Sequence, residues 1–168
     1  MRYSNTVAIL GAGTEDGLWM AKGICKSYRI LLMDEELQKL TALSFIVAQH
    51  YKLALTENLL SSKEAGWEAD IIVLAAPAEV QPAIARRISE VATCKTVILL
   101  SRNESQMANI SAILPQAHLV EIMLTNTAEG NSLKAAISGT SASGIETAKL
   151  LLDCCHPAEI TIQHLITV

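Results

Sequence analysis

The 168-residue sequence has little charge and no long apolar run. Charged residues make up 18% of the chain against 51% hydrophobic residues, and the mean hydropathy is +0.33. This composition excludes a disordered chain and predicts a soluble domain with a large core. Four apolar residues precede Gly11, too few for a secretory signal, and no run approaches the roughly 18 residues of a membrane helix. We therefore expect a cytoplasmic protein.

Cysteine is sparse and lacks the spacing of a functional site. Cys25, Cys94, Cys154 and Cys155 include no C-x-x-C pair, so the sequence predicts neither a zinc site nor a redox dithiol. Reduced, buried thiols are the expected state of all four. The last two lie in the segment "DCCHP", where consecutive helical residues point in different directions, so we expect no metal there.

Basic clusters and linkers are also missing. The net charge is −4 and the longest basic run is Arg86-Arg87, which excludes a nucleic-acid footprint. The four histidines stand apart, and none accompanies a serine elbow, so hydrolase chemistry has no support. Without a linker, repeat or low-complexity segment, we expect one domain over residues 1–168 and no second domain.

What the sequence does contain is a regular alternation of short apolar runs and longer helical patterns. Runs that are apolar at nearly every position are typical of strands buried on both faces of a parallel sheet. The expected strands cover 6–10, 29–33, 52–55, 70–76, 95–101, 118–124, 133–138 and 159–166, and the expected helices cover 17–27, 35–50, 79–93, 105–114 and 143–155. Ser143 is the expected N-cap of the last helix, with Glu146 completing a capping box. The pattern predicts an α/β fold with a doubly wound, mostly parallel sheet and helices on both faces.

A glycine-rich turn follows the first expected strand. Gly11, Gly13 and Gly17 are spaced G-x-G-x-x-x-G, with the third glycine one residue late for the usual dinucleotide fingerprint. In such a turn the amides at the start of the next helix bind phosphate. Two acids, Glu15 and Asp16, stand at this helix start, where the helix dipole stabilises their negative charge. The same charge would repel a pyrophosphate unless both side chains point away from it.

Asp34 ends the second expected strand, 23 residues after Gly11. This is close to the offset of the acid that binds the adenosine ribose in dinucleotide-binding folds. Its alternative role is the N-cap of the helix expected from Glu35, and the two roles are compatible. Because Asp34, Glu35 and Glu36 place three negative charges together before the first nearby cation, Lys39, the sequence favours NAD over NADP.

Six segments together resemble a known family over nearly the whole chain. They are "VAILGAGTEDGLWMAKGI", "RILLMDEELQKL", "EADIIVLAAPAEV", "KTVILLSRNES", "ILPQAHLVEIMLTNT" and "LKAAISGTSASGIETAKLLL". The order resembles the NADP-binding domain of deazaflavin-dependent NADP oxidoreductases and, more distantly, that of pyrroline-5-carboxylate reductases. The resemblance implies a Rossmann-type fold and hydride transfer with a nicotinamide at the carboxyl ends of the strands.

The resemblance also assigns residues to a cofactor site. It places in the phosphate loop and under the ribose and diphosphate Gly11, Ala12, Gly13, Thr14, Gly17, Ala75, Ala76 and Pro77. It places Asn126 and Thr127 near the nicotinamide end, and it has Ser101, Arg102 and Asn103 facing the same cleft. The candidate catalytic residues are Arg102, Asn126 and Thr127. The family has a glycine at Thr14 and a Ser-Arg pair at Asp34 and Glu35, so its clamp for a 2′-phosphate is replaced by acids.

Two of the candidate residues have ordinary alternatives. Arg102 is suited to hold an anionic substrate, yet its position favours the ordinary role of a solvated loop arginine. Asn126 is suited to bind a carboxamide, yet asparagine is also common in the turn after a strand.

Three functions remain open from the sequence. The first is an NAD(P)-dependent oxidoreductase acting on a small molecule or on a flavin- or deazaflavin-type acceptor. The second is a dinucleotide-binding sensor without catalysis, and the third is an interaction module with a degenerate Rossmann fold. Because the chain is apolar and has few charges, we expect part of its surface to be covered in a homodimer.

Overall fold

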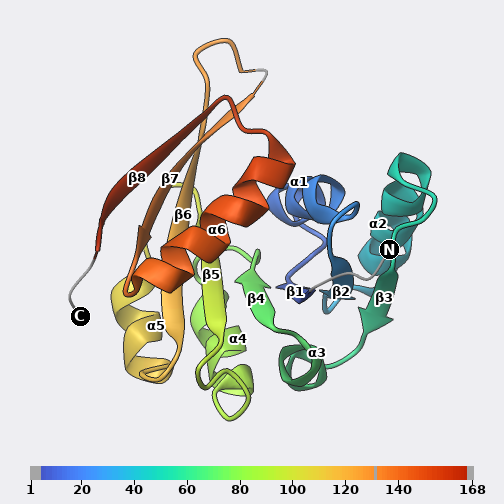
Figure 1. Cartoon of the computed structure of the whole chain (residues 1–168). Coiled ribbons are helices and arrows are strands. Elements are labelled where there is room, and N and C mark those ends of the chain that lie inside the picture. Colours follow the sequence, from blue (N-terminus) through green and yellow to red (C-terminus); the bar gives the residue numbers. More distant parts are fainter. Residues whose placement is uncertain (1–4, 131, 166–168) are drawn as a thin grey trace.

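The computed structural model describes residues 5–130 and 132–165 (Figure 1). In chain order the elements are β1 (Thr6–Leu10), α1 (Glu15–Ile24), β2 (Arg29–Met33), α2 (Leu37–His50), β3 (Thr56–Leu59), α3 (Ser62–Glu68), β4 (Ile71–Leu74), α4 (Gln81–Ile88), β5 (Thr96–Ser101), α5 (Met107–Ile113), β6 (His118–Asn126), β7 (Leu133–Gly139), α6 (Ala142–Cys155) and β8 (Glu159–Leu165). Residue 166, the end of the last expected strand, lies outside the described residues. None of the described helices has the length and apolar character needed to cross a membrane.

All eight strands form one sheet, in the order β3-β2-β1-β4-β5-β6-β7-β8. The pairs from β3 to β6 are parallel, β7 is antiparallel to β6, and β8 is parallel to β7. The first six strands therefore follow the doubly wound 3-2-1-4-5-6 order of the Rossmann fold. This confirms the α/β class and the mostly parallel sheet expected from the sequence.

The sheet is covered on both faces, which explains why its strands are apolar at consecutive positions. Alternate residues of one strand enter different cores: Val7 and Ile9 pack under α1, α2 and α6, whereas Ala8 and Leu10 pack under α3, α4 and α5. In Figure 1, α6 crosses one face of the sheet and ends beside α1. Because both faces are buried, apolar side chains are favoured at every position of a strand and not only at alternate positions.

Three local expectations were wrong. The run 52–55 is turn and loop rather than strand, and the neighbouring edge strand is the polar segment Thr56–Leu59. Helix α6 begins one residue before Ser143, at Ala142, and its N-cap is Ser141, whose hydroxyl accepts a hydrogen bond from Gly144 N at 3.1 Å. Of the four cysteines expected to be buried, Cys25 is buried, Cys154 and Cys155 are partly buried, and Cys94 is exposed.

Helix α3 was not expected from the sequence. Its N-cap is Ser61, and its carboxyl end is held by a residue distant in sequence, Lys95. The ammonium group of Lys95 donates to the carbonyls of Gly66, Trp67 and Ala69 at 2.7–2.8 Å. Burial lowers the pKa of Lys95. Orphan carbonyls at a helix end are thus satisfied by a tertiary contact.

A glycine allows α1 and α6 to touch. A Cβ at Gly23 would lie 2.4 Å from the Cys155 sulfur and 2.8 Å from the Cys155 Cα, so any side chain there would push the helices apart. This contact fixes where α6 ends relative to the glycine-rich turn at the start of α1.

We predict that Gly23→Ala lowers the free energy of unfolding by about 1–3 kcal/mol, because overpacking a helix contact forces backbone shifts. Urea denaturation of the two proteins measures the difference. Gly66→Ala in α3 is the control, since its nearest neighbour is a side-chain methyl at 3.1 Å, with no backbone atom among the three nearest. Equal losses in the two variants would contradict the helix-contact argument.

Candidate functional site

The glycine-rich turn lies where the sheet order reverses, between the carboxyl ends of β1 and β4. Gly11 has φ +76°, and a Cβ there would lie 2.5 Å from Ala76 N. The amides of Gly11 and Ala12 both donate to Met33 O, at 2.9 and 3.0 Å. Glycine is therefore required at position 11 both for the left-handed backbone and for the close approach to the loop after β4.

The late third glycine has a packing role. A Cβ at Gly17 would lie 2.5 Å from Ala12 O, so the turn rests directly on α1. Thr14, between the second and third glycines, is the N-cap of α1, and its hydroxyl accepts from Gly17 N at 3.0 Å. The same hydroxyl donates a hydrogen bond to Ala75 O at 2.9 Å. Thr14 thus joins the turn to the end of β4, a role that a glycine could not fill.

Asp34 is held against the glycine-rich turn. Its carboxylate accepts from Gly13 N at 2.9 Å and from Glu36 N at 3.0 Å. The helix that follows begins at Leu37 with Glu36 as N-cap, so the N-cap role considered for Asp34 before a helix from Glu35 is wrong in position. Asp34 therefore has two fixed acceptor bonds and retains further lone pairs toward the neighbouring hollow.

A hollow of about 270 Å³ lies beside Asp34. It is lined by Gly11, Gly13, Thr14, Met33, Asp34, Glu35, Glu36, Lys39, Ala76, Pro77, Val80, Ile84 and Arg87. Two of its three acids are paired, Glu35 with Arg87 at 2.7 Å and Glu36 with Lys39 at 2.5 Å. Arg87 comes from α4 and could not be placed here from the sequence. These exposed pairs contribute little energy but lower the net negative charge of the hollow.

A larger hollow of about 490 Å³ adjoins the first on the β5 side. It is lined by Thr14, Glu15, Asp16, Ala75, Ala76, Pro77, Ala78, Glu79, Leu100, Ser101, Arg102, Asn103, Glu104 and Asn126. The two hollows share Thr14, Ala76 and Pro77. Together they extend along the carboxyl ends of β2, β1, β4 and β5.

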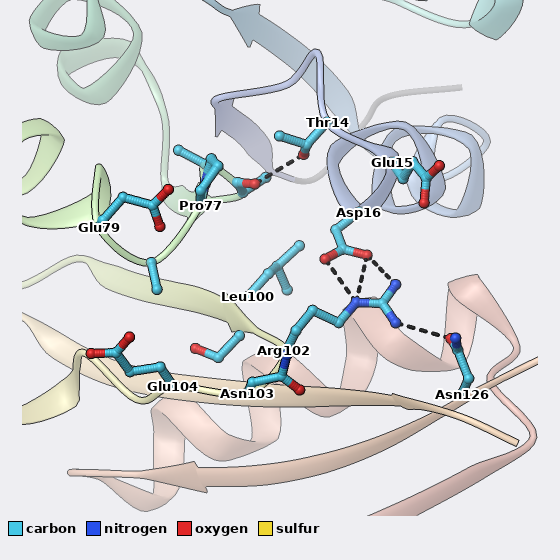
Figure 2. A pocket seen from close by; sticks show the side chains of 14 residues that line it. Thr14, Glu15, Asp16, Pro77, Glu79, Leu100, Arg102, Asn103, Glu104 and Asn126 are labelled. Carbon is cyan, nitrogen blue, oxygen red and sulfur yellow. Dashed lines mark hydrogen bonds and ion pairs between the residues drawn. The ribbon is translucent and has the colours of Figure 1, made fainter.

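Arg102 bridges the larger hollow (Figure 2). Its guanidinium forms a two-point pair with the Asp16 carboxylate, with Nε to Oδ2 at 3.0 Å and Nη2 to Oδ1 at 2.5 Å. The remaining terminal nitrogen donates to Asn126 Oδ1 at 3.0 Å. The hydrogen bond to Asp16 raises the pKa of Arg102 above its ordinary value, in spite of partial burial. Two guanidinium N–H donors are left without a partner in this network.

The two acids at the start of α1 therefore behave differently. Asp16 turns into the hollow, where Arg102 neutralises it. The Glu15 carboxylate lies beside the helix, outside that pair (Figure 2). At the first two helical positions the amides of Glu15 and Asp16 have no intrahelical acceptor, so they remain donors toward the hollow.

Two buried polar side chains hold the walls of the larger hollow, and neither was singled out from the sequence. Glu121, only 6% exposed, accepts from Ser101 at 2.8 Å and from Ser105 at 2.9 Å, and so fixes the loop that carries Arg102. The amide of Gln81 donates to Leu100 O at 2.8 Å and also to the loop after β4. A single acid within an apolar strand is the signal that marks Glu121.

Most residues assigned from the sequence gather at these two hollows. Those that line one or both are Gly11, Gly13, Thr14, Asp34, Glu35, Ala75, Ala76, Pro77, Ser101, Arg102, Asn103 and Asn126. Ala12 and Gly17 are buried beneath the turn. Thr127 bonds to Ser132 across the β6–β7 turn and does not line either hollow. Within the described residues, no group of side chains is suited to hold a metal ion.

Comparisons with known proteins agree on the fold. No protein-family model and no curated protein matches the chain. A pyrroline-5-carboxylate reductase from Coxiella burnetii matches with a TM-score of 0.74 and 15% identity, over 99% of this chain and 60% of that one. A proposed F420-dependent NADP reductase from Arthrobacter sp. FB24 matches with a TM-score of 0.70 and 16% identity, over 96% and 86%.

A third match is prephenate dehydrogenase from A. aeolicus in complex with hydroxyphenyl propionate and NAD+, with a TM-score of 0.72 and 15% identity, over 95% of this chain and 59% of that one. The chain thus spans about three fifths of the length of two of these proteins. At such low identities the likeness establishes the fold alone, which is the Rossmann-type fold.

Proposed function

We propose that the chain binds a nicotinamide dinucleotide across the two adjoining hollows and acts as an NAD(P)-dependent oxidoreductase. The observation that carries the proposal is their arrangement at the switch point of the sheet, with the start of α1 at the residues they share. In open α/β sheets, ligands bind at this point. Proteins with the same fold include one in complex with NAD+ and one named for its use of NADP.

The residues present fit such a cofactor. The turn from Gly11 to Thr14 is fixed, and the free amides of Glu15 and Asp16 are suited to a pyrophosphate. Asp34 is suited to accept from ribose hydroxyls in the smaller hollow. A nicotinamide, when bound, supplies or accepts hydride. The role left to the chain is to orient it and to exclude water, which needs no protein acid or base.

In this proposal Arg102 and Asn126 orient the reacting partners. The two N–H donors that Arg102 retains are suited to a carbonyl or carboxylate, and Asn126 has amide donors for a carboxamide. Thr127, bonded within the β6–β7 turn, supports the position of Asn126 from the next residue. The acceptor in the reaction is a small molecule or a flavin- or deazaflavin-type compound.

We further propose that NAD is preferred over NADP. Asp34 is held at the turn, so a 2′-phosphate beside it would meet a fixed negative charge. Lys39 and Arg87 line the same hollow, but each is already paired with an acid. The balance therefore remains unfavourable for a second phosphate, although less so than the sequence indicated.

We expect NADH to bind at least about tenfold more tightly than NADPH, a difference of about 1.4 kcal/mol, in a titration followed by nicotinamide fluorescence. Asp34→Asn should reduce this ratio, because it removes the fixed charge while keeping a polar side chain. Asp153→Asn, an exposed acid on α6, is the matched control and should leave the ratio unchanged. Tighter NADPH binding would contradict the NAD preference, and binding of neither would leave only the interaction-module function.

A sensor without catalysis is the second candidate, favoured by the charges around the larger hollow. Glu15, Asp16, Glu79 and Glu104 line it with Arg102 as its one arginine or lysine. This negative balance disfavours anionic substrates at the end where hydride transfer would take place.

We expect the protein to transfer deuterium stereospecifically from C4-labelled NADH to at least one acceptor among a flavin, a deazaflavin and a cyclic imine. Mass spectrometry of the reduced acceptor measures the transfer, and Arg102→Ala should slow it at least tenfold without abolishing dinucleotide binding. Dinucleotide binding with no transfer to any acceptor would favour the sensor. The mixture without protein gives the background rate.

We also propose that the chain forms a homodimer through the edge of the sheet at β3. Large apolar side chains are exposed there, with Phe45 on α2 at 63%, Leu60 after β3 at 73% and Trp67 on α3 at 74%. Exposed apolar groups on the elements around an edge strand favour an interaction surface there.

Light scattering at micromolar concentration should give twice the 18.1 kDa chain mass. Phe45→Glu together with Trp67→Glu should give a monomer, because a buried charge without a partner is strongly unfavourable. A monomeric mass for the unmodified chain would contradict the dimer.

A further inference from the structure

A second large hollow lies along α1, outside the proposed cofactor site. It has a volume of about 500 Å³ and is bounded by α1 and by the carboxyl ends of α2 and α6. Its polar lining consists mainly of Lys22, Lys26, His50 and His156, with Glu15 as its single acid and Trp19 beside them. We call it the basic hollow.

The walls of the basic hollow are fixed by helix packing rather than by loose loops. Gly23 brings α1 against Cys155, which lines the hollow together with His156. His156 caps α6 in a left-handed conformation, with φ +50°, and its amide donates to Leu152 O at 3.1 Å. The chain therefore turns sharply at the point where His156 lines the hollow.

The lysines of the basic hollow differ from most other cations of the chain. Six of the described arginines and lysines form ion pairs, namely Arg29, Lys39, Lys63, Arg87, Arg102 and Lys134. Lys22 and Lys26 form no ion pair with the residues that the structure describes. The dipole of α1 favours Lys22 in its last turn. It does not explain why cationic and imidazole groups from three elements converge on one hollow.

The rest of the lining is mainly apolar. Trp19 is half-buried and offers a flat ring and an indole N–H. Burial raises the pKa of Cys155 to about 12, so its thiol stays protonated and unreactive at neutral pH. These surroundings suit reversible binding rather than covalent chemistry.

We propose that the basic hollow binds a small aromatic phosphate, a ligand whose two negative charges are met by Lys22 and Lys26 while its ring lies against Trp19. The imidazoles of His50 and His156 supply further N–H donors. The larger hollow of the proposed cofactor site has the opposite charge balance, so the two sites select different ligands. The basic hollow does not depend on the proposed oxidoreductase function.

The test uses Trp19 as the reporter. The chain has two tryptophans, so Trp67→Phe leaves Trp19 as the single tryptophan, which is excited selectively at wavelengths too long for tyrosine to absorb. Phenyl phosphate should quench its emission saturably, with a Kd of about 1 mM or tighter. Benzyl alcohol, which lacks the anion, and inorganic phosphate, which lacks the ring, should bind at least tenfold more weakly. Benzoate separates a phosphate from a carboxylate preference and should also be weaker.

Lys22→Gln with Lys26→Gln should weaken phenyl phosphate at least tenfold in the Trp67→Phe protein. The matched control is Arg86→Gln with Lys149→Gln, which removes the same charge outside the hollow and should change the Kd less than twofold. Binding should persist with saturating NADH. No saturable quenching, equal effects of the two double variants, or displacement by NADH would each overturn the proposal, and thermal melting confirms that the variants are folded.

Discussion

The close approach of Gly11 to Ala76 is the constraint on which the rest of the site depends. It brings together the chain segments that leave two adjacent parallel strands at the point where the winding of the sheet changes direction. A side chain at position 11 would meet backbone rather than a flexible side chain, so the contact has no easy relief. Thr14 reinforces it with its hydroxyl on Ala75 O. The glycine-rich turn after β1 and the loop after β4 meet at this contact, and one hollow lies on each side of it.

Acidic side chains around the two hollows form ion pairs with arginines. Asp16 with Arg102 and Glu35 with Arg87 each join elements far apart in sequence. The acids that seemed to oppose a dinucleotide are therefore partly neutralised once the chain is folded. The pair of Glu35 with Arg87 is exposed and contributes little free energy, whereas the pair of Asp16 with Arg102 is partly buried.

The sequence predicted most of the fold because burial on two faces leaves a strong apolar signal. It failed where that signal is absent. In β3 the strand lies at the edge of the sheet and Leu59 is its one buried residue, while the apolar residues just before it, Leu53 and Leu55, are exposed in a loop. Helix α3 was missed because it is short and depends on Lys95, contributed by a segment beyond β4.

The site shows the same division. The glycine-rich turn and Asp34 were predictable because their geometry is encoded within one βαβ unit. Arg87 and Glu121 were not, because their roles come from elements that only the folded sheet brings together. The N-cap of α2 was misplaced by local reasoning, since Asp34 bonds to the turn as well as to the helix start.

The hydrogen bonds of Thr14 and Asp34 have a thermodynamic consequence. They hold the turn before any ligand arrives, so a phosphate that binds there has little backbone entropy to remove. In the proposed function the turn is therefore preorganised, whereas Arg102 is held by side-chain contacts alone and is the group that would adjust to a ligand. The fixed amides of the turn would bind the phosphates that all dinucleotides share. Arg102 would instead contact the part of the ligand that differs from one ligand to the next.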